Sequence, residues 1–218
     1  MQKKSEHYLF NFPEGSEAEK DIDLISKTQE QAYKKITSFI NDSNFPVIKY
    51  YLYEDRKTKG EVTDNDGNGH ADPDKFEVYA VYNKNTKCIG PHEDTHLLTK
   101  NMGLPPQLFR EGLAEYFSEK WHEKPHLYWA GKFLKENKLY PISSLINNNF
   151  WYETDESISY PQSGAFIGFL ISEIGKDKFI KLYKQLDNKE NSQSNKVLIL
   201  EITGKIISEW EKKWLSQL

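Results

Sequence analysis

The sequence lacks the features that define several large classes of protein. A single cysteine among 218 residues cannot form an internal disulfide, which excludes a small disulfide-stapled scaffold. No stretch approaches the roughly 18 consecutive apolar residues of a membrane-spanning helix, and no signal-peptide core is present, so we expect no membrane span. The 29 basic and 33 acidic residues are interspersed and give a net charge of −4. Because no basic stripe results, nucleic acid is not an expected partner.

These absences indicate a globular chain long enough to bury a substantial core. The sequence leaves its oligomeric state and its compartment open. A cytoplasmic protein and an exported or lipoprotein-derived enzyme whose leader has been removed are both compatible with the first residues, Met1 to Lys4. We expect Cys88 to be a buried structural thiol rather than a nucleophile or a metal ligand.

The most informative segment that is present is His92-Glu93-Asp94-Thr95-His96. On a helix, His92 and His96 project from one face and can bind a single metal ion. Glu93 is offset by about 100° around the helix axis, where its carboxylate can orient a water molecule but is poorly placed as a further ligand. The segment therefore predicts two ligands and a general base of a metal-dependent hydrolase.

A second match to H-E-x-x-H, His122-Glu123-Lys124-Pro125-His126, has a different interpretation. Pro125 inside the pentapeptide would break the helix that gives the spacing its meaning. We expect an exposed helix end there rather than a metal site.

The first match is followed by the segment Leu108 to Phe117, which contains Glu111-Gly112 and Glu115. With this segment the chain resembles the gluzincin metallopeptidases, in particular the peptidase-MA-like bacterial families, in which an H-E-x-x-H helix precedes a helix bearing E-G-x-A-x-[DE]. The resemblance implies that Glu111 is the third zinc ligand and that Glu115 orients a ligand histidine. The i, i+4 spacing agrees, since it places both carboxylates on one helical face. Glu115 as the ligand, and a plain surface carboxylate pair, are the alternatives.

The resemblance implies a Zn²⁺-dependent peptidase acting on a peptide or protein substrate. Zinc would be held by His92, His96 and Glu111, would polarise the scissile carbonyl and would lower the pKa of a water molecule, whose proton Glu93 would accept. One alternative is a catalytically silent gluzincin-like domain that binds or regulates. Another is an interaction domain without a metal. Substrate preference, and endo- versus exopeptidase cleavage, are not legible in the sequence.

The expected fold is α+β and zincin-like, with a small mixed or antiparallel sheet subdomain, then a mainly helical one, and the H-E-x-x-H helix between them. We expect an N-terminal helical extension over residues 1–44 and a peptidase domain over 45–218, with its sheet part at about 45–88 and its helical part at about 89–218. Residues 47–53 and 76–82 have the β-branched and aromatic content of strands. Predicted helices cover 16–42, 90–102, 106–120, 125–138, 161–174, 176–187 and 203–217.

A segment rich in Asp and Gly precedes the second predicted strand. Asp64, Asp66, Asn68 and Asp72 match four positions of an EF-hand calcium loop, so Ca²⁺ is a candidate ligand. Lys75 stands where the bidentate glutamate belongs, which favours a simple turn between strands.

The same segment suggests a way of holding substrate. Gluzincins present an edge strand to the peptide, and Gly69, His70 and Ala71 are candidates for that strand, to which a peptide would add by backbone pairing.

The remaining catalytic group is a donor to the oxyanion. Tyr160, ahead of a predicted helix start at Pro161, resembles the tyrosine that such families supply after the glutamate helix. Simple packing of Tyr160 is the alternative, and Tyr152 and His126 are weaker candidates for the same role. A Thr203-Gly204 turn followed by a helix that ends in Trp214 resembles the close of such domains.

Overall fold

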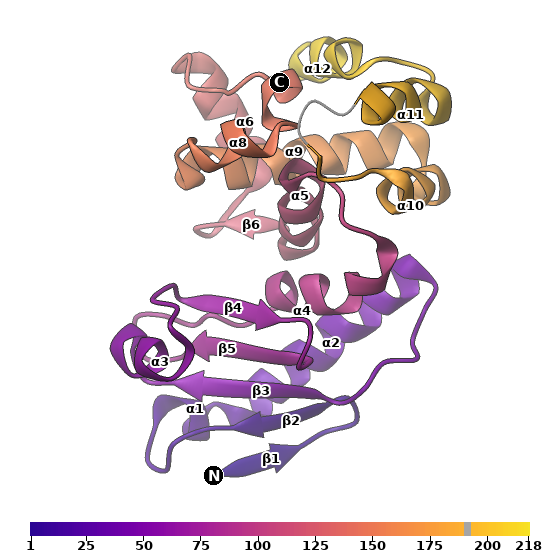
Figure 1. The fold of residues 1–218 in the computed structure, drawn as a ribbon. Coiled ribbons are helices and arrows are strands. Elements are labelled where there is room, and N and C mark those ends of the chain that lie inside the picture. The colour runs from indigo at the N-terminus through magenta and orange to yellow at the C-terminus, as the bar shows by residue number, and fades with distance from the viewer. Residues whose placement is uncertain (190–192) are drawn as a thin grey trace. The chain divides into compact units, whose positions relative to one another are not determined.

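The computed structural model describes residues 1–189 and 193–218, and the chain divides into two compact units, Met1–Lys100 and Asn101–Leu218. Figure 1 shows that the first unit holds a five-stranded sheet and the second is almost entirely helical. This confirms the predicted α+β class, with a small mixed sheet followed by helices. The boundary lies twelve residues beyond the expected end of the sheet part at residue 88, because the H-E-x-x-H helix belongs to the first unit.

The sheet of the first unit has the strand order β1-β2-β3-β5-β4. Its two outer pairs are antiparallel and its inner pairs, β2 with β3 and β3 with β5, are parallel. The strands are β1 (Gln2–Lys4), β2 (Tyr8–Asn11), β3 (Ile48–Tyr53), β4 (Gly69–Asp72) and β5 (Glu77–Val81).

Alternation of side chains along β3 explains which face of the sheet is covered. Ile48, Tyr50 and Leu52 are buried, whereas Lys49 between them is exposed. This period of two is that of a strand with one face in the core. The core between sheet and helices therefore lies on the Tyr50 side of the sheet.

The predicted helix over residues 16–42 is two helices, α1 (Glu17–Lys20) and α2 (Ile22–Ile40). Ser16 caps α1, since its side chain accepts a hydrogen bond from the Glu19 amide. Asp21 interrupts the helix, and its carboxylate accepts hydrogen bonds from Tyr82 and Lys87 of the same unit.

The prediction of a purely helical extension over residues 1–44 missed β1 and β2. Tyr8 and Phe10 of β2 are fully buried, and β2 is hydrogen-bonded to β3 along its length. Residues 1–44 are thus an integral part of the sheet unit. Three- and four-residue strands are too short for their alternation to stand out in a sequence.

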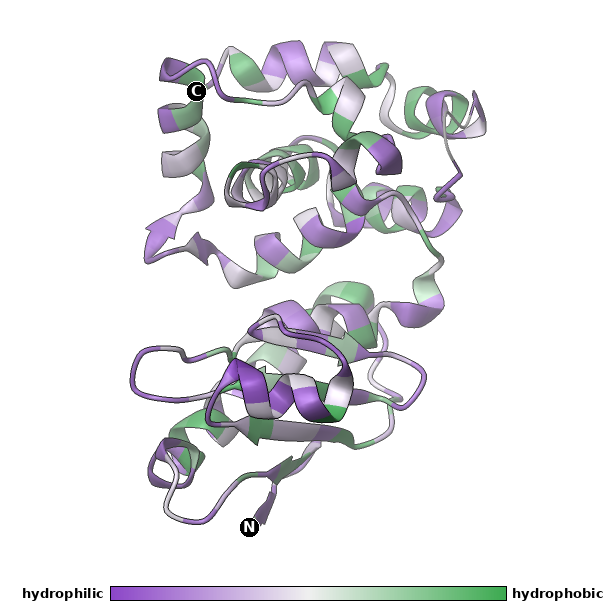
Figure 2. Cartoon of the chain, turned by 60° about the vertical axis from the view of Figure 1, so that its left-hand side comes forward, coloured by the Kyte–Doolittle hydropathy of each residue, from purple (hydrophilic) through white to green (hydrophobic). Residues whose placement is uncertain are grey.

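Two further helices complete the first unit, α3 (Arg56–Thr63) and α4 (Pro91–Leu98). The turns of α3 are largely hydrophilic in Figure 2, which explains why no apolar stripe announced this helix. A short 3₁₀ turn, η1 (Lys100–Met102), follows α4 where the prediction extended one helix to residue 102. Gly103 then has φ of +102°, the left-handed conformation expected for the glycine that ends this segment.

The second unit is built around α5 (Gln107–Ser118) and α9 (Glu156–Ile174), which pack closely because Gly112 lacks a side chain. A Cβ atom at Gly112 would lie 2.5 Å from Ile167 Cγ1 and 3.0 Å from the Ser163 carbonyl oxygen, both on α9. The remaining elements of the unit are β6 (Lys120–Trp121), β7 (Lys124–Pro125), α6 (His126–Lys135), α7 (Ile142–Leu145), α8 (Asn148–Tyr152), α10 (Lys176–Gln185), α11 (Gln193–Thr203) and α12 (Ile207–Leu215).

Most predicted helices of this unit are present, with shifted ends. The helix predicted from residue 161 begins five residues earlier, so Pro161 lies inside α9. Trp214 of α12 packs edge-on against Phe166 of α9, as expected for the closing helix. Among the described residues, no helix has both the length and the apolar composition required to cross a bilayer.

Candidate active site

The two histidines of the first H-E-x-x-H segment lie together on α4. Gly90, at φ +116°, precedes the helix and Pro91 occupies its first turn, which is a favourable helix start. The His92 and His96 rings are edge-on with centroids 5.1 Å apart, and a ligand nitrogen of one lies within 4.8 Å of a ligand nitrogen of the other. Both side chains are half-buried. The predicted histidine pair is therefore on one helical face, where a single ion could bind both rings.

Glu93 lies against the edge strand of the sheet. A Cβ atom at Gly69 would be 2.9 Å from Glu93 Oε1 and 2.6 Å from Cys88 Sγ. A side chain at position 69 would force these atoms to shift, and glycine lets the β4 backbone approach the carboxylate closely. The predicted general base and the predicted substrate strand are thus neighbours within one unit.

Two further side chains of the first unit, Cys88 and Lys59, lie near Glu93. Burial raises the pKa of the Cys88 thiol to about 12, with a smaller contribution from the Glu93 charge. The thiol is therefore protonated at neutral pH and unreactive, as expected for a structural cysteine. Lys59 of α3 is fully buried, and its ammonium donates to Asn65. Desolvation lowers the pKa of Lys59, and the negative charge of Glu93 opposes that shift.

Two residues of β4 direct their backbone polar groups toward the outer edge of the sheet, away from β5. The Val81 amide donates to the Asn68 carbonyl, and Gly69 lies opposite Ala80 in the next position of the ladder. Because hydrogen-bonded and non-hydrogen-bonded positions alternate in an antiparallel pair, His70 bonds to β5 while Gly69 and Ala71 point their N–H and C=O groups away from it.

The His70 side chain lies on the opposite face of the sheet from Gly69. Its ring stacks on Tyr79 with centroids 5.0 Å apart, and desolvation lowers its pKa. Its buried Nδ1 has no hydrogen-bond partner in the part of the chain that the structure describes.

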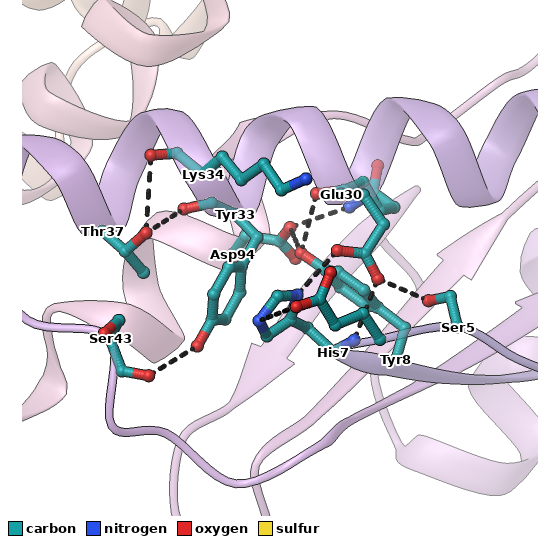
Figure 3. A network of polar contacts seen from close by, with 11 residues as sticks. Ser5, His7, Tyr8, Glu30, Tyr33, Lys34, Thr37, Ser43 and Asp94 are labelled. Carbon is teal, nitrogen blue, oxygen red and sulfur yellow. Dashed lines mark hydrogen bonds and ion pairs between the residues drawn. The ribbon is translucent and has the colours of Figure 1, made fainter.

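Asp94, one residue after Glu93, is the centre of a buried polar network that sequence reasoning missed. Its Oδ2 accepts hydrogen bonds from Tyr8 Oη at 2.5 Å and from Gln29 Nε2 at 2.9 Å. Figure 3 shows Tyr8 of β2 directed at Asp94 beneath α2. Burial raises the pKa of the Asp94 carboxyl to about 8, against the lowering effect of its Tyr8 hydrogen bond. The available signal was a polar Gln29 on the apolar stripe of α2, between Ile25 and the alanine at position 32.

In the second unit, Glu111 and Glu115 occupy α5 and are both buried, with 7% and 2% of their surface exposed. The surface carboxylate pair considered above is therefore wrong. Glu115 Oε2 lies 2.6 Å from Nε2 of His126, which is also buried. Gly112, between these two glutamates in sequence, faces α9 of the same unit.

Tyr160 lies within α9, rather than ahead of a helix as predicted. Its ring packs between Trp121 and Trp151 at centroid distances of 5.8 and 5.7 Å, and it is half-buried. The weaker candidate Tyr152 is 71% exposed, and its hydroxyl accepts a hydrogen bond from Gln107.

The second H-E-x-x-H match is not a helix. It forms a β6–β7 hairpin in which His122 and Glu123 have positive φ, and α6 begins at His126. Pro125 ends the hairpin, so the helix break predicted from this proline is correct and the pentapeptide lacks the geometry of a metal site.

The Asp-rich segment does not form the compact loop of an EF-hand. Asp64 ends α3 in the left-handed conformation, whereas Gly69–Asp72 is an extended strand paired with β5. Asp72 accepts hydrogen bonds from the amides of Asp74 and Lys75 and pairs with the Lys75 ammonium. A strand rising about 3.4 Å per residue carries Asp72 away from the loop, so the four predicted calcium ligands do not wrap one point.

Comparisons with known proteins bear on the fold. No family model and no curated protein sequence matches the chain. A solved structure does: the chain is similar to a mutant of an M1 zinc metallopeptidase from Deinococcus radiodurans, with a TM-score of 0.56 and 12% sequence identity. The match covers 95% of this chain and 47% of that protein, so the chain spans about half its length. The fold is zincin-like.

Proposed function

We propose that this chain is a zinc-dependent peptidase of the gluzincin type, which hydrolyses peptide bonds with Glu93 as the general base. The observation that carries the proposal is the contact between Glu93 and the edge strand at Gly69, on the helix that also bears the histidine pair. A peptide bond held along β4 would lie beside this carboxylate. The zincin-like fold supports the same interpretation, because the similar solved structure is a zinc metallopeptidase.

The proposed metal ligands are His92, His96 and Glu111, each of which offers one ligand atom. Two imidazole nitrogens and a carboxylate oxygen are the donor set of one class of catalytic zinc site, which leaves a fourth position open. Zinc bound there would polarise the scissile carbonyl and lower the pKa of a water molecule toward about 7. Glu111 is 7% exposed, so its carboxylate is largely shielded from water.

The remaining roles fall to this chain's own side chains. Glu93 accepts the proton of the attacking water and delivers it to the leaving amine nitrogen. Tyr160, held between two tryptophan rings, donates to the oxyanion. Glu115 orients a ligand histidine. The outward N–H and C=O groups of Gly69 and Ala71 hold the substrate backbone.

Metal content and turnover test the proposal together. Protein purified without added metal should contain about one zinc per chain by elemental analysis, and a His92→Ala variant should lose it. A mixed library of internally quenched peptides should be hydrolysed by the unsubstituted protein and not after chelation. Zinc without hydrolysis would instead favour a catalytically silent binding domain, and the absence of both would overturn the proposal.

A further inference from the structure

The start of α4 is held by a side chain from another helix. Gln29 of α2 accepts a hydrogen bond from the Gly90 amide at 2.6 Å and donates to the Gly90 carbonyl at 3.1 Å. The same Nε2 donates to Asp94 Oδ2 at 2.9 Å. Gln29 and Asp94 both have none of their surface exposed. We call Gln29, Gly90 and Asp94 the Gln29 clamp.

The clamp holds the start of a helix whose N-cap residue has no side chain of its own to make a capping hydrogen bond. The first amides of a helix need acceptors, which a Ser, Thr, Asp or Asn at the N-cap usually provides. Position 90 is a glycine at φ +116° and makes no side-chain cap. Gln29, 61 positions earlier in the chain, bonds the N-cap residue itself: it accepts from the Gly90 amide and donates to the Gly90 carbonyl.

The adjacent face of α2 is also fixed. Glu30, the next residue, accepts hydrogen bonds from Ser5 Oγ and the His7 amide, and its second oxygen lies 2.7 Å from His7 Nδ1. Figure 3 shows these contacts beside those of Tyr8 and Asp94. Tyr8 Oη also lies 3.0 Å from the Gln29 carbonyl. Consecutive residues of α2 therefore tie the β1–β2 connection, through half-buried contacts, and the start of α4, through buried ones, into one network.

We propose that Gln29 is a positioning residue for the active site, acting through the Gly90 peptide and Asp94 to fix the angle and rotation of α4. This inference rests on the proposed function, since it gives Gln29 the task of placing His92, Glu93 and His96. Metal sites require their ligands within about 0.5 Å of the productive geometry. A helix start without its acceptor would add motion at the turn that carries His92 and Glu93.

A matched pair of substitutions on α2 tests the proposal. Gln29→Met keeps the volume of the side chain and removes all three hydrogen bonds, whereas Gln31→Met makes the same change at an exposed position of the same helix. Relative to Gln31→Met, we expect Gln29→Met to weaken zinc binding about tenfold and to lower kcat with KM little changed. In metal-free protein the Gly90 amide should exchange hydrogen faster, because its acceptor is gone.

Gln29→Glu covers the case in which Gln29→Met does not fold. This variant retains an acceptor for the Gly90 amide but loses the Nε2 donor to both the Gly90 carbonyl and Asp94, so its zinc affinity should lie between those of Gln29→Met and the unsubstituted protein. Faster exchange at Gly90 with zinc affinity and kcat equal to those of Gln31→Met would overturn the positioning role. If the proposed function is wrong, the unsubstituted protein itself will contain no zinc and hydrolyse no peptide. The hydrogen-exchange measurement at Gly90 requires neither zinc nor activity, so it still tests the contact made by Gln29.

Discussion

His126 Nε2 lies 2.6 Å from Glu115 Oε2, and at most 5% of either residue is exposed. Gly164 of α9 closes over this pair, since a Cβ atom there would be 2.7 Å from Glu115 Cβ and 3.0 Å from the His126 ring. The histidine of the discarded second H-E-x-x-H match thus holds the carboxylate that is predicted to orient a zinc ligand. Glu115 is fixed from within its own unit.

Removing the histidine of this pair should destabilise the protein. His126→Leu leaves the buried Glu115 carboxylate without one of its partners, and a broken buried pair costs about 3 kcal/mol in the free energy of unfolding. His122→Leu, at an exposed position of the adjoining hairpin, is the control and should change stability by less than about 0.5 kcal/mol. Urea unfolding measures both. Equal midpoints for the two variants would mean that the pair contributes nothing to stability.

Glu93→Gln should abolish hydrolysis while zinc is retained. The substitution preserves the shape of the side chain but removes the proton acceptor, a change that lowers kcat by about 10²–10⁴-fold. Glu123→Gln makes the same change in the β6–β7 hairpin and should leave kcat unaltered. Elemental analysis accompanies the rate measurements. A Glu93→Gln protein that turns over at the normal rate would remove Glu93 from the mechanism.

Gly69→Ala should disturb Glu93, the proposed general base, directly. The added methyl would lie 2.6 Å from Cys88 Sγ and 2.9 Å from Glu93 Oε1, and both contacts are too short unless these side chains or the strand shift. We expect a loss of about 1–3 kcal/mol in stability and at least a tenfold loss in kcat. Cys88→Ala in the same chain removes one of the two contacts and should restore part of both.

Gly131→Ala is a control for this experiment, because nothing lies within 4 Å of a Cβ atom at that position of α6. Alanine should therefore stabilise the helix by about 0.5–1 kcal/mol without affecting kcat. If Gly69→Ala behaved in the same way, the close packing of β4 against Glu93 would be refuted.

The metal-free protein should lose stability as the pH rises from about 4 to about 8. The pKa of Asp94 is about 8 in the folded protein and near 3.8 when unfolded, so folding favours the protonated carboxyl. The contribution is fully present below pH 4 and is lost as the pH approaches 8, by an amount on the order of a few kcal/mol. Asp94→Asn should flatten this dependence in urea titrations at several pH values. The exposed control Asp74→Asn should retain it, and a slope shared by all three proteins would assign it to other groups.

The sequence alone predicted those elements whose residue pattern lies within one continuous segment. The β-branched and aromatic content of residues 47–53 and 76–82 predicted β3 and β5 to within one residue at each end, and the helix predicted over 16–42 covers α2. Lys3 and Lys4 of β1 carry no such pattern, and β1 exists because β2 offers it a partner. Parallel pairing of β2 with β3 joins segments about 40 residues apart, and no periodicity records which strands will meet.

The same limit applies to the candidate site. The spacing of His92 and His96 is a property of one helix, and it was predicted correctly. The contact of Gly69 with Glu93 depends on a strand packed against a helix, and the role of Gln29 on a hydrogen bond that spans 61 residues. Both are tertiary contacts, so the residue types alone could only suggest that a glycine or a buried amide had a reason to be there.

The sheet has two unpaired borders, β1 and β4, of three and four residues. An exposed edge strand can pair with a strand of another copy and so promote aggregation. Natural proteins reduce this pairing with short edge strands, lysines and prolines. Here the edge strand β1 contains Lys3 and Lys4, and Pro73 directly follows the edge strand β4. The short edge strands thus disfavour self-assembly. For the same reason, β4 can form backbone hydrogen bonds with only a few residues of any peptide that pairs with it.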